Sequence, residues 1–301
     1  MRVLITGATG LIGSQIVKDC HSKGINVNYL TTSKSKLEKA DNYKGFYWDP
    51  YQGEIDEDCF YGVSSIIHLV GASIAERWTD AYKDIIIKSR VQTTGLLVEV
   101  LGNIDHEITH VVSASAIGYY PDSLHKIYDE TEQEINSSFL GKVVVKWESA
   151  VDKFMQVGIK VAKVRIGVVM AKEGGALQKL MQPVKYYAGA PLGSGKQWQS
   201  WIHINDLSRL FIYISQHSFA GIFNGVSPNP VTNERLTKEI ASVLEKPIIL
   251  PKVPAFMLKL MLGEMSAVVL ESQLISSNKI ESEGFEFDYT NITKALQDLL
   301  K

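Results

Sequence analysis

The sequence has little cysteine and no long apolar segment. The two cysteines among its 301 residues, Cys20 and Cys59, fit no metal-ligand spacing, so we predict no metal site. Both thiols are interpreted as small buried side chains in a reducing compartment, which favours a cytoplasmic location. No apolar run approaches the roughly 20 residues that cross a bilayer. The apolar start, Met1–Gly13, is broken by glycine and lacks a cleavage region, so it is typical of a first strand rather than a signal peptide.

An excess of charge of one sign is also missing. Lysine and arginine number 31 against 33 acids, and the formal net charge is -2. Nucleic acids and anionic membrane surfaces attract basic proteins, so neither is expected as a partner. The composition, 45% hydrophobic and 21% charged, is ordinary for a globular protein. We therefore expect the partner to be a small-molecule substrate.

What the sequence does contain is a regular alternation of strand and helix patterns over its first two-thirds. This order predicts an α/β fold with a doubly wound parallel sheet of the Rossmann type. Runs of valine, isoleucine and leucine between polar helices are typical of strands buried on both faces. The predicted strands are Arg2–Thr6, Asn26–Thr31, Gly45–Trp48, Ser64–Val70, Thr109–Ser115 and Lys160–Gly167, and the predicted helices are Leu11–Ser22, Thr79–Leu101, Phe139–Val157 and Asp206–Gln216.

The pattern changes from about Glu173, where several glycines mark a loop-rich region. We predict that residues 1–170 form the Rossmann domain and that residues 203–225 return to it. Residues 171–202 and 226–301 are expected to form a smaller C-terminal lobe that binds substrate.

The first strand ends in a glycine-rich loop, Thr6–Gly13, with the spacing G-x-x-G-x-x-G. Gly7 permits the tight turn, Gly10 lets the backbone approach a pyrophosphate, and Gly13 lets the helix lie close to the strand. The start of the next helix offers free N–H groups to that anion. Because the loop follows a strand and opens a helix, it predicts a dinucleotide site. The predicted contacts are Gly7, Thr9, Gly10, Leu11, Ile12 and Gly13.

The end of the second strand indicates which dinucleotide binds. Enzymes that use NAD usually carry an acid there, which holds the ribose 2′-hydroxyl. Here Thr31, Thr32 and Lys34 come first, and no acid appears before Glu38. Hydroxyls and lysines suit a 2′-phosphate, so we predict NADP, with NAD less favoured. The alternative is a solvated loop with no ligand.

The chain resembles the extended short-chain dehydrogenase/reductases, and in particular their atypical epimerase family proteins with a C-terminal domain of unknown function. The resemblance covers nearly the whole chain. It implies a Rossmann fold and a nicotinamide cofactor, lined by Thr31, Thr32, Leu69, Val70, Ile85 and Arg90, but it does not imply a particular reaction. It is carried by Thr6–Gly13, His68–Ile74, Arg77–Thr79, Ser89–Val91 with Thr94, Lys146–Glu148, Val164–Val169, Gly174–Leu177, Pro191–Gly195 with Gln197, and Trp201–Leu207.

Reductases that this chain resembles use a serine together with Tyr-x-x-x-Lys on the following helix. Ser115 ends the fifth strand and is the serine candidate, ahead of Ser113. Lys146 is the lysine candidate, but Lys142 stands where the tyrosine is expected. An ammonium with an ordinary pKa near 10.4 cannot replace a phenol as a base. Tyr120, or its neighbour Tyr119, is the remaining candidate phenol, with aromatic packing as the alternative.

A downstream set of residues is the candidate substrate site, consisting of Arg165, Gln197, Trp201 and His203. Their aromatic faces and polar groups would suit a polar ring or chain. The alternatives are core packing for Trp201 and a structural role for His203. The leading hypothesis is an NADP-dependent oxidoreductase or epimerase acting on a small, sugar-like substrate. The alternative is an NADP-binding regulator with little catalysis, which the missing tyrosine favours.

Overall fold

The computed structural model describes residues 1–301 and is built around one nine-stranded sheet. The order is β13-β9-β7-β6-β1-β2-β4-β3, and β5 pairs with β4. Seven strands run parallel, in the order expected of a Rossmann fold, and only β3 and β5 are antiparallel. The strands are β1 (Arg2–Thr6), β2 (Asn26–Thr31), β3 (Lys39–Ala40), β4 (Tyr43–Asp49), β5 (Glu54–Ile55), β6 (Ser65–His68), β7 (His110–Ala116), β9 (Lys160–Ile166) and β13 (Gly221–Gly225).

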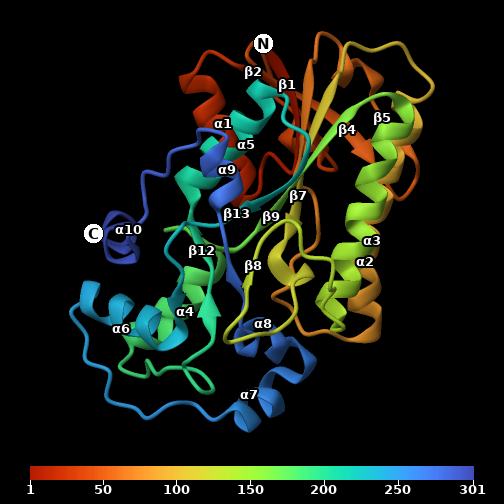
Figure 1. Ribbon diagram of the computed structural model, residues 1–301. Coiled ribbons are helices and arrows are strands. Elements are labelled where there is room, and N and C mark those ends of the chain that lie inside the picture. The colour runs from red at the N-terminus through yellow and green to blue at the C-terminus, as the bar shows by residue number, and fades with distance from the viewer.

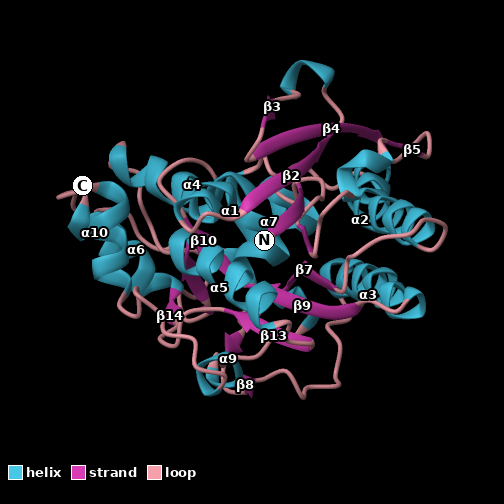
Figure 2. Cartoon of the chain, turned by 90° about the horizontal axis from the view of Figure 1, so that it is seen from above, coloured by secondary structure: helices cyan, strands magenta, loops and turns pink.

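Helices cover both faces of this sheet. The helices α1 and α5 pack together on one face, and α2 packs beside α3 on the other (Figures 1 and 2). The doubly wound α/β class predicted from the sequence is therefore confirmed. The α-helices are α1 (Leu11–Ser22), α2 (Asp80–Leu101), α3 (Phe139–Asp152), α4 (Gly175–Lys185), α5 (Ile204–His217), α6 (Asn233–Val243), α7 (Ala255–Leu262), α8 (Ala267–Leu270), α9 (Asn278–Ser282) and α10 (Ile292–Leu300).

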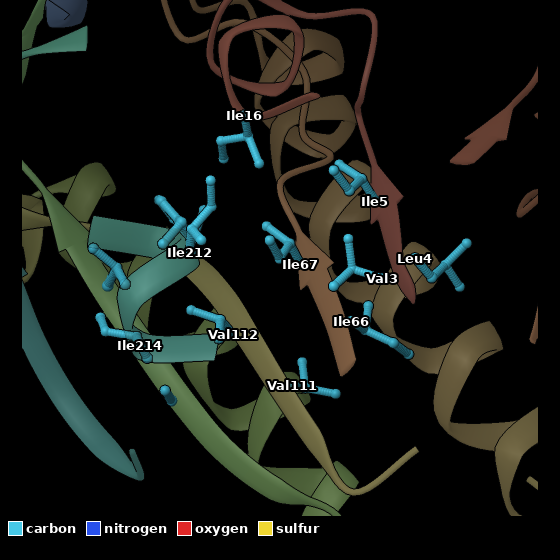
Figure 3. Close-up of a cluster of buried hydrophobic side chains, with 14 of the residues drawn as sticks. Val3, Leu4, Ile5, Ile16, Ile66, Ile67, Val111, Val112, Ile212 and Ile214 are labelled. Atoms are coloured by element: carbon cyan, nitrogen blue, oxygen red, sulfur yellow. The ribbon is translucent and has the colours of Figure 1, made fainter. Parts of the chain in front are cut away.

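The main core fills both faces of the central strands. Neighbouring strands pair in register, so equivalent residues form rows across the sheet. Figure 3 shows Ile16 of α1 and Ile212 of α5 on the same side of the sheet as Ile67. This burial on both faces explains the nearly continuous apolar strands. One row contains Leu4, Ile66 and Val111, and the row on the opposite face contains Ile5, Ile67 and Val112.

A second hydrophobic cluster lies beyond the end of the sheet. It combines residues from α4, α6 and α10 with Met170, Trp201 and Ile204 (Figure 1). Three short strand pairs tie this part of the chain together. They are β10 (Val168–Met170) with β12 (Trp201–His203), β11 (Trp198–Gln199) with β14 (Val231–Thr232), and β8 (Ile127–Tyr128) with β15 (Leu274–Ile275).

The predicted elements match the observed ones within a few residues. One difference concerns the predicted helix Phe139–Val157, whose last five residues form a separate 3₁₀ turn, Lys153–Val157. The division into residues 1–170 with 203–225 and the remainder stays a prediction. Ile280 and Phe285, from the predicted lobe, pack in the main core, so the two parts share side chains.

Candidate functional site

The start of α1 is open to a ligand. Gly10 occupies the N-cap position and has no side chain that could bond the first turn. The backbone amides of Leu11, Ile12 and Gly13 make no backbone hydrogen bond, and Thr9 and Gly10 are exposed. Free amides at a helix N-terminus bind anions. The loop lies where β1 ends, beside β6, at the point where the strand order reverses.

Glycine is needed at the three positions of this loop for different reasons. Gly7 adopts a φ of +72°, which other residues rarely tolerate. A Cβ on Gly13 would lie 2.1 Å from the carbonyl oxygen of Gly7, so the fold itself needs glycine there. Gly10 has an ordinary φ of -83°, and its only tight neighbour would be the same oxygen at 3.3 Å. The fold therefore has little need of glycine at position 10, whereas a pyrophosphate approaching the loop would need it.

The turn after β2 presents hydroxyls and an amine. Thr31 is buried, and its hydroxyl accepts a hydrogen bond from the amide of Ser33 at 3.1 Å. Thr32 and Lys34 are exposed, and the Lys34 ammonium lies 4.8 Å from the centre of the Tyr47 ring. These side chains are free to meet a phosphate at the adenosine end of a dinucleotide.

A buried polar chain fixes the ends of β1 and β6 beneath the crevice. The amide of Leu69 donates to the hydroxyl of Thr6, which lies 2.9 Å from Nδ1 of His68. Nε2 of His68 lies 3.0 Å from the hydroxyl of Thr94, which itself donates to the carbonyl of Arg90. His68 therefore carries its proton on Nε2 and accepts from Thr6 at Nδ1. Complete burial lowers the pKa of His68 to about 4, so the ring stays neutral.

The three apolar residues expected along the cofactor lie in different environments. Leu69 and Val70 are half-buried, directly beside the backbone of Gly7. Ile85 is exposed on α2. Their contact with a cofactor stays a prediction.

Arg90 is buried beneath the loop that follows β6 and has no acidic partner. Its guanidinium donates to the carbonyls of Ile86 at 2.9 Å and Ala72 at 3.2 Å, and it lies over the Trp147 ring. Nε of Arg90 and Nε1 of Trp147 are buried without a partner. Burial lowers the pKa of Arg90 to about 10, which leaves it charged at neutral pH. This cation adds positive potential beneath the crevice.

Ser115 lies at the carboxyl end of β7 but is already engaged. Its hydroxyl donates to Oε1 of Glu148 at 2.6 Å. Arg165 holds the same carboxylate through Nε at 2.9 Å and Nη2 at 3.0 Å. Burial alone would lower the pKa of Arg165, but the hydrogen bonds and charge of Glu148 raise it. Serine, carboxylate and guanidinium thus form one buried cluster.

The other two catalytic candidates lie in different environments. Tyr120 is fully buried and donates to the side-chain oxygen of Asn224 at 2.7 Å. Lys146 lies on the exposed face of α3, together with Lys142, because the opposite face carries the residues that pack on the sheet. Tyr119, which lies 3.5 Å over the Arg165 guanidinium, is the tyrosine nearer the strand end. The catalytic roles of Tyr120 and Lys146 stay predictions.

The four residues predicted to contact substrate are all buried and occupied within the protein. Arg165 is paired with Glu148, and Gln197 donates to the carbonyls of Leu192 and Val269. Trp201 is in the second core, and His203 caps α5 by accepting from the amide of Asn205. Their contact with a substrate stays a prediction, and within the protein each of these side chains already has a structural partner.

Glu148 is the residue of this cluster that the sequence argument passed over. It stands on the apolar face of α3, between Trp147 and Val151. A charged residue at such a position needs a buried partner, and the structure identifies this partner as Arg165. Among all residues, no group of three or more histidine, cysteine or acidic side chains is arranged to hold a metal ion. No helix combines the length and the apolar character needed to span a bilayer.

Known proteins match the chain over its whole length. The model of the NAD dependent epimerase/dehydratase family matches residues 3–225, and a domain of unknown function, DUF1731, matches residues 253–299. An epimerase family protein of Staphylococcus haemolyticus is 36% identical over 299 residues, which is 99% of this chain and 98% of that protein. An epimerase family protein of Staphylococcus aureus strain N315 is 36% identical over 300 residues, with the same coverage.

Several solved structures have the same fold as this chain. The human epimerase family protein SDR39U1, crystallised with NADPH, superposes with a TM-score of 0.85 at 25% identity over 99% of both chains. A nucleoside-diphosphate sugar epimerase from Corynebacterium glutamicum gives 0.77 at 29% identity, covering all of this chain and 58% of that one. UDP-N-acetylglucosamine 4-epimerase from Bacillus cereus, at 18% identity and 0.79, shares the fold. With its glycine loop at the sheet's switch point and a family model spanning most of its length, the chain belongs to the NAD dependent epimerase/dehydratase family.

Proposed function

We propose that the protein binds NADP(H) and uses it to oxidise, reduce or epimerise a small polar substrate of the nucleotide-sugar type. The observation that carries the proposal is the uncapped start of α1 beside the exposed Thr32 and Lys34. The free amides suit the pyrophosphate, and the lysine and hydroxyl suit a 2′-phosphate. When bound, the nicotinamide supplies or accepts a hydride. NADPH in the human relative and the nucleotide-sugar epimerases of the same fold support this assignment.

The relative affinity for NADPH and NADH tests the part of the proposal that concerns the cofactor. NADPH and NADH are titrated separately by nicotinamide fluorescence, and NADPH is expected to bind more tightly. Lys34→Glu should weaken NADPH binding about tenfold or more, because a charge-assisted hydrogen bond is lost and a repulsion is added. It should change NADH binding little.

Lys23→Glu is the matched control for this variant. Lys23 is exposed at the other end of α1, away from the crevice, and the substitution makes the same change in charge. Equal affinity for NADH and NADPH in the unmodified protein would contradict the assignment of NADP.

One observation favours a second function, that of an NADP-binding regulator with little catalysis. The first turn of α3 carries no tyrosine, and the Ser115 hydroxyl is committed to Glu148. A panel of UDP-sugars incubated with the cofactor-loaded protein separates the two functions. Conversion of one UDP-sugar into its epimer, or a change in absorbance at the nicotinamide band, supports the enzyme. Tight NADPH binding without any conversion supports the regulator.

A further inference from the structure

Glu271 is an acidic residue of the C-terminal segment whose carboxylate reaches across to the segment that precedes α3. Nδ2 of the buried Asn136 donates to Oε2 of Glu271 at 2.9 Å, and the Gln273 amide lies 3.4 Å from the same oxygen. The backbone amide of Asn136 donates to the carbonyl of Tyr119 at 2.8 Å. The carboxylate is therefore held beside the turn that follows β7.

The surroundings of this carboxylate contain no cation. Glu271 is half-buried, and burial raises its pKa, as does the charge of Asp122, while the bond from Asn136 acts in the opposite direction. The Ser138 hydroxyl lies near enough to favour the ionised form, yet it is buried and makes no hydrogen bond of good geometry. A carboxyl in such a place exchanges its proton closer to neutral pH than an exposed one does.

Other buried acids of the protein are different. Glu148 is held by Arg165 through two hydrogen bonds, and Asp206 pairs with Arg209. Each of these acids therefore has a guanidinium as a direct partner. Glu271 is held by neutral amides, and it remains partly open to solvent.

Glu271 is tied through Asn136 to the turn that follows β7, in the half of the sheet over which a Rossmann fold holds its second nucleotide. In a Rossmann fold the pyrophosphate lies at the start of α1, and the second nucleotide extends over the other half of the sheet. In this chain that half begins with β6 and β7, and the turn Ile117–Tyr119, whose last carbonyl accepts from Asn136, directly follows β7. Gln273 also donates to the carbonyl of Tyr120 at 3.1 Å, so the segment that carries Glu271 is fixed there. The first turn of α3 consists of Phe139, Leu140, Gly141 and Lys142 and carries no acidic residue.

We propose that Glu271 transfers the proton that accompanies hydride transfer, in place of the missing tyrosine. The proposal rests on the proposed function. In the reducing direction, hydride from NADPH forms a C–H bond at the substrate carbonyl carbon, and the carbonyl oxygen takes the proton of the Glu271 carboxyl. The products are the alcohol, NADP⁺ and the Glu271 carboxylate. In the oxidising direction the carboxylate accepts the hydroxyl proton while hydride passes to NADP⁺.

The test needs only the cofactor, because the oxidised nicotinamide ring is positively charged and the reduced ring is neutral. A carboxylate close to the ring favours NADP⁺ over NADPH. At pH 8 the ratio of the Kd of NADP⁺ to the Kd of NADPH should rise about tenfold in Glu271→Gln. The glutamine keeps an oxygen to accept from Asn136. The ratio of the unmodified protein should rise as the pH is lowered to 5, and that of the variant should not change.

Glu134→Gln is the matched control, since Glu134 is an exposed acid two residues from Asn136. Its ratio should equal that of the unmodified protein. The proposal fails if Glu271→Gln binds both cofactors with an unchanged ratio, and the proposed function then still stands. If the unmodified protein binds no NADPH, the proposed function itself fails. If Glu271→Gln does not fold, a ratio that stays constant from pH 5 to 8 in the unmodified protein overturns the proposal.

Discussion

Single residues of the glycine loop separate what the fold needs from what a ligand needs. Gly10→Val should abolish NADPH binding and leave the protein folded. The backbone at position 10 already has a φ that valine adopts, but the side chain would occupy the space of the pyrophosphate. Calorimetric titration measures binding, and circular dichroism measures the fold.

Gly13→Ala provides the contrast within the same loop. Its new Cβ would collide with the backbone of Gly7 and Ala8, so the main effect of this variant should be a lower free energy of unfolding. Retained NADPH affinity in a folded Gly10→Val protein would refute the site.

His68 makes stability depend on pH. Its pKa is lowered by burial to about 4 in the folded protein, against about 6.5 in an unfolded chain. Between these values the unfolded state binds more protons, so the free energy of unfolding decreases as pH falls from 6.5 to 4. The loss reaches about 3 kcal/mol for this one residue. Urea unfolding at several pH values measures it, and His68→Gln should show a shallower decrease.

The exposed His125 supplies the control, because His125→Gln should leave the pH dependence as it is. Burial also lowers the pKa of His203 to about 4 despite the nearby Asp298. His203 should therefore contribute to the pH dependence of the free energy of unfolding in both variants. A slope unchanged by His68→Gln would mean that the ring is protonated in the folded state, contrary to its hydrogen bonds with Thr6 and Thr94.

At the scale of elements, α3 shows what a sequence can and cannot predict. The apolar spacing predicted this helix and its buried face, because burial repeats with the helical period. The same period places Lys146 among the exposed positions of the helix. Glu271 was missed because its partner, Asn136, is 135 residues away, and no local pattern reports such a distance.

The pair of Glu148 on α3 and Arg165 on β9 joins two elements in the core. Glu148→Ala should lower the free energy of unfolding by about 3–5 kcal/mol, because it leaves a buried guanidinium without a counter-ion. The double variant Glu148→Leu with Arg165→Met should recover part of that loss, since two apolar side chains replace two charges. Urea unfolding of the single and double variants gives the comparison. A double variant less stable than Glu148→Ala would show instead that the ion pair stabilises the fold more than two apolar side chains in the same place do.

At the scale of the whole molecule, the two hydrophobic clusters are not divided along the chain. The second cluster draws Leu177 and Trp201 from one part of the sequence and Leu236 and Leu296 from another. The family model that ends at residue 225 therefore ends inside a shared core. A fragment that stopped there would expose the apolar side chains that α6 and α10 cover.

This shared packing predicts that the protein unfolds as one unit. Leu296 on α10 is completely buried, so Leu296→Ala should cost about 2–5 kcal/mol through lost contacts and a cavity. Because Ile280 and Phe285 join the C-terminal segment to the main core, the loss should lower one transition for the entire molecule. Differential scanning calorimetry of the full chain measures the number of transitions and compares the calorimetric with the van't Hoff enthalpy. Two transitions, with only one shifted by Leu296→Ala, would show instead that the C-terminal part is an independent folding unit.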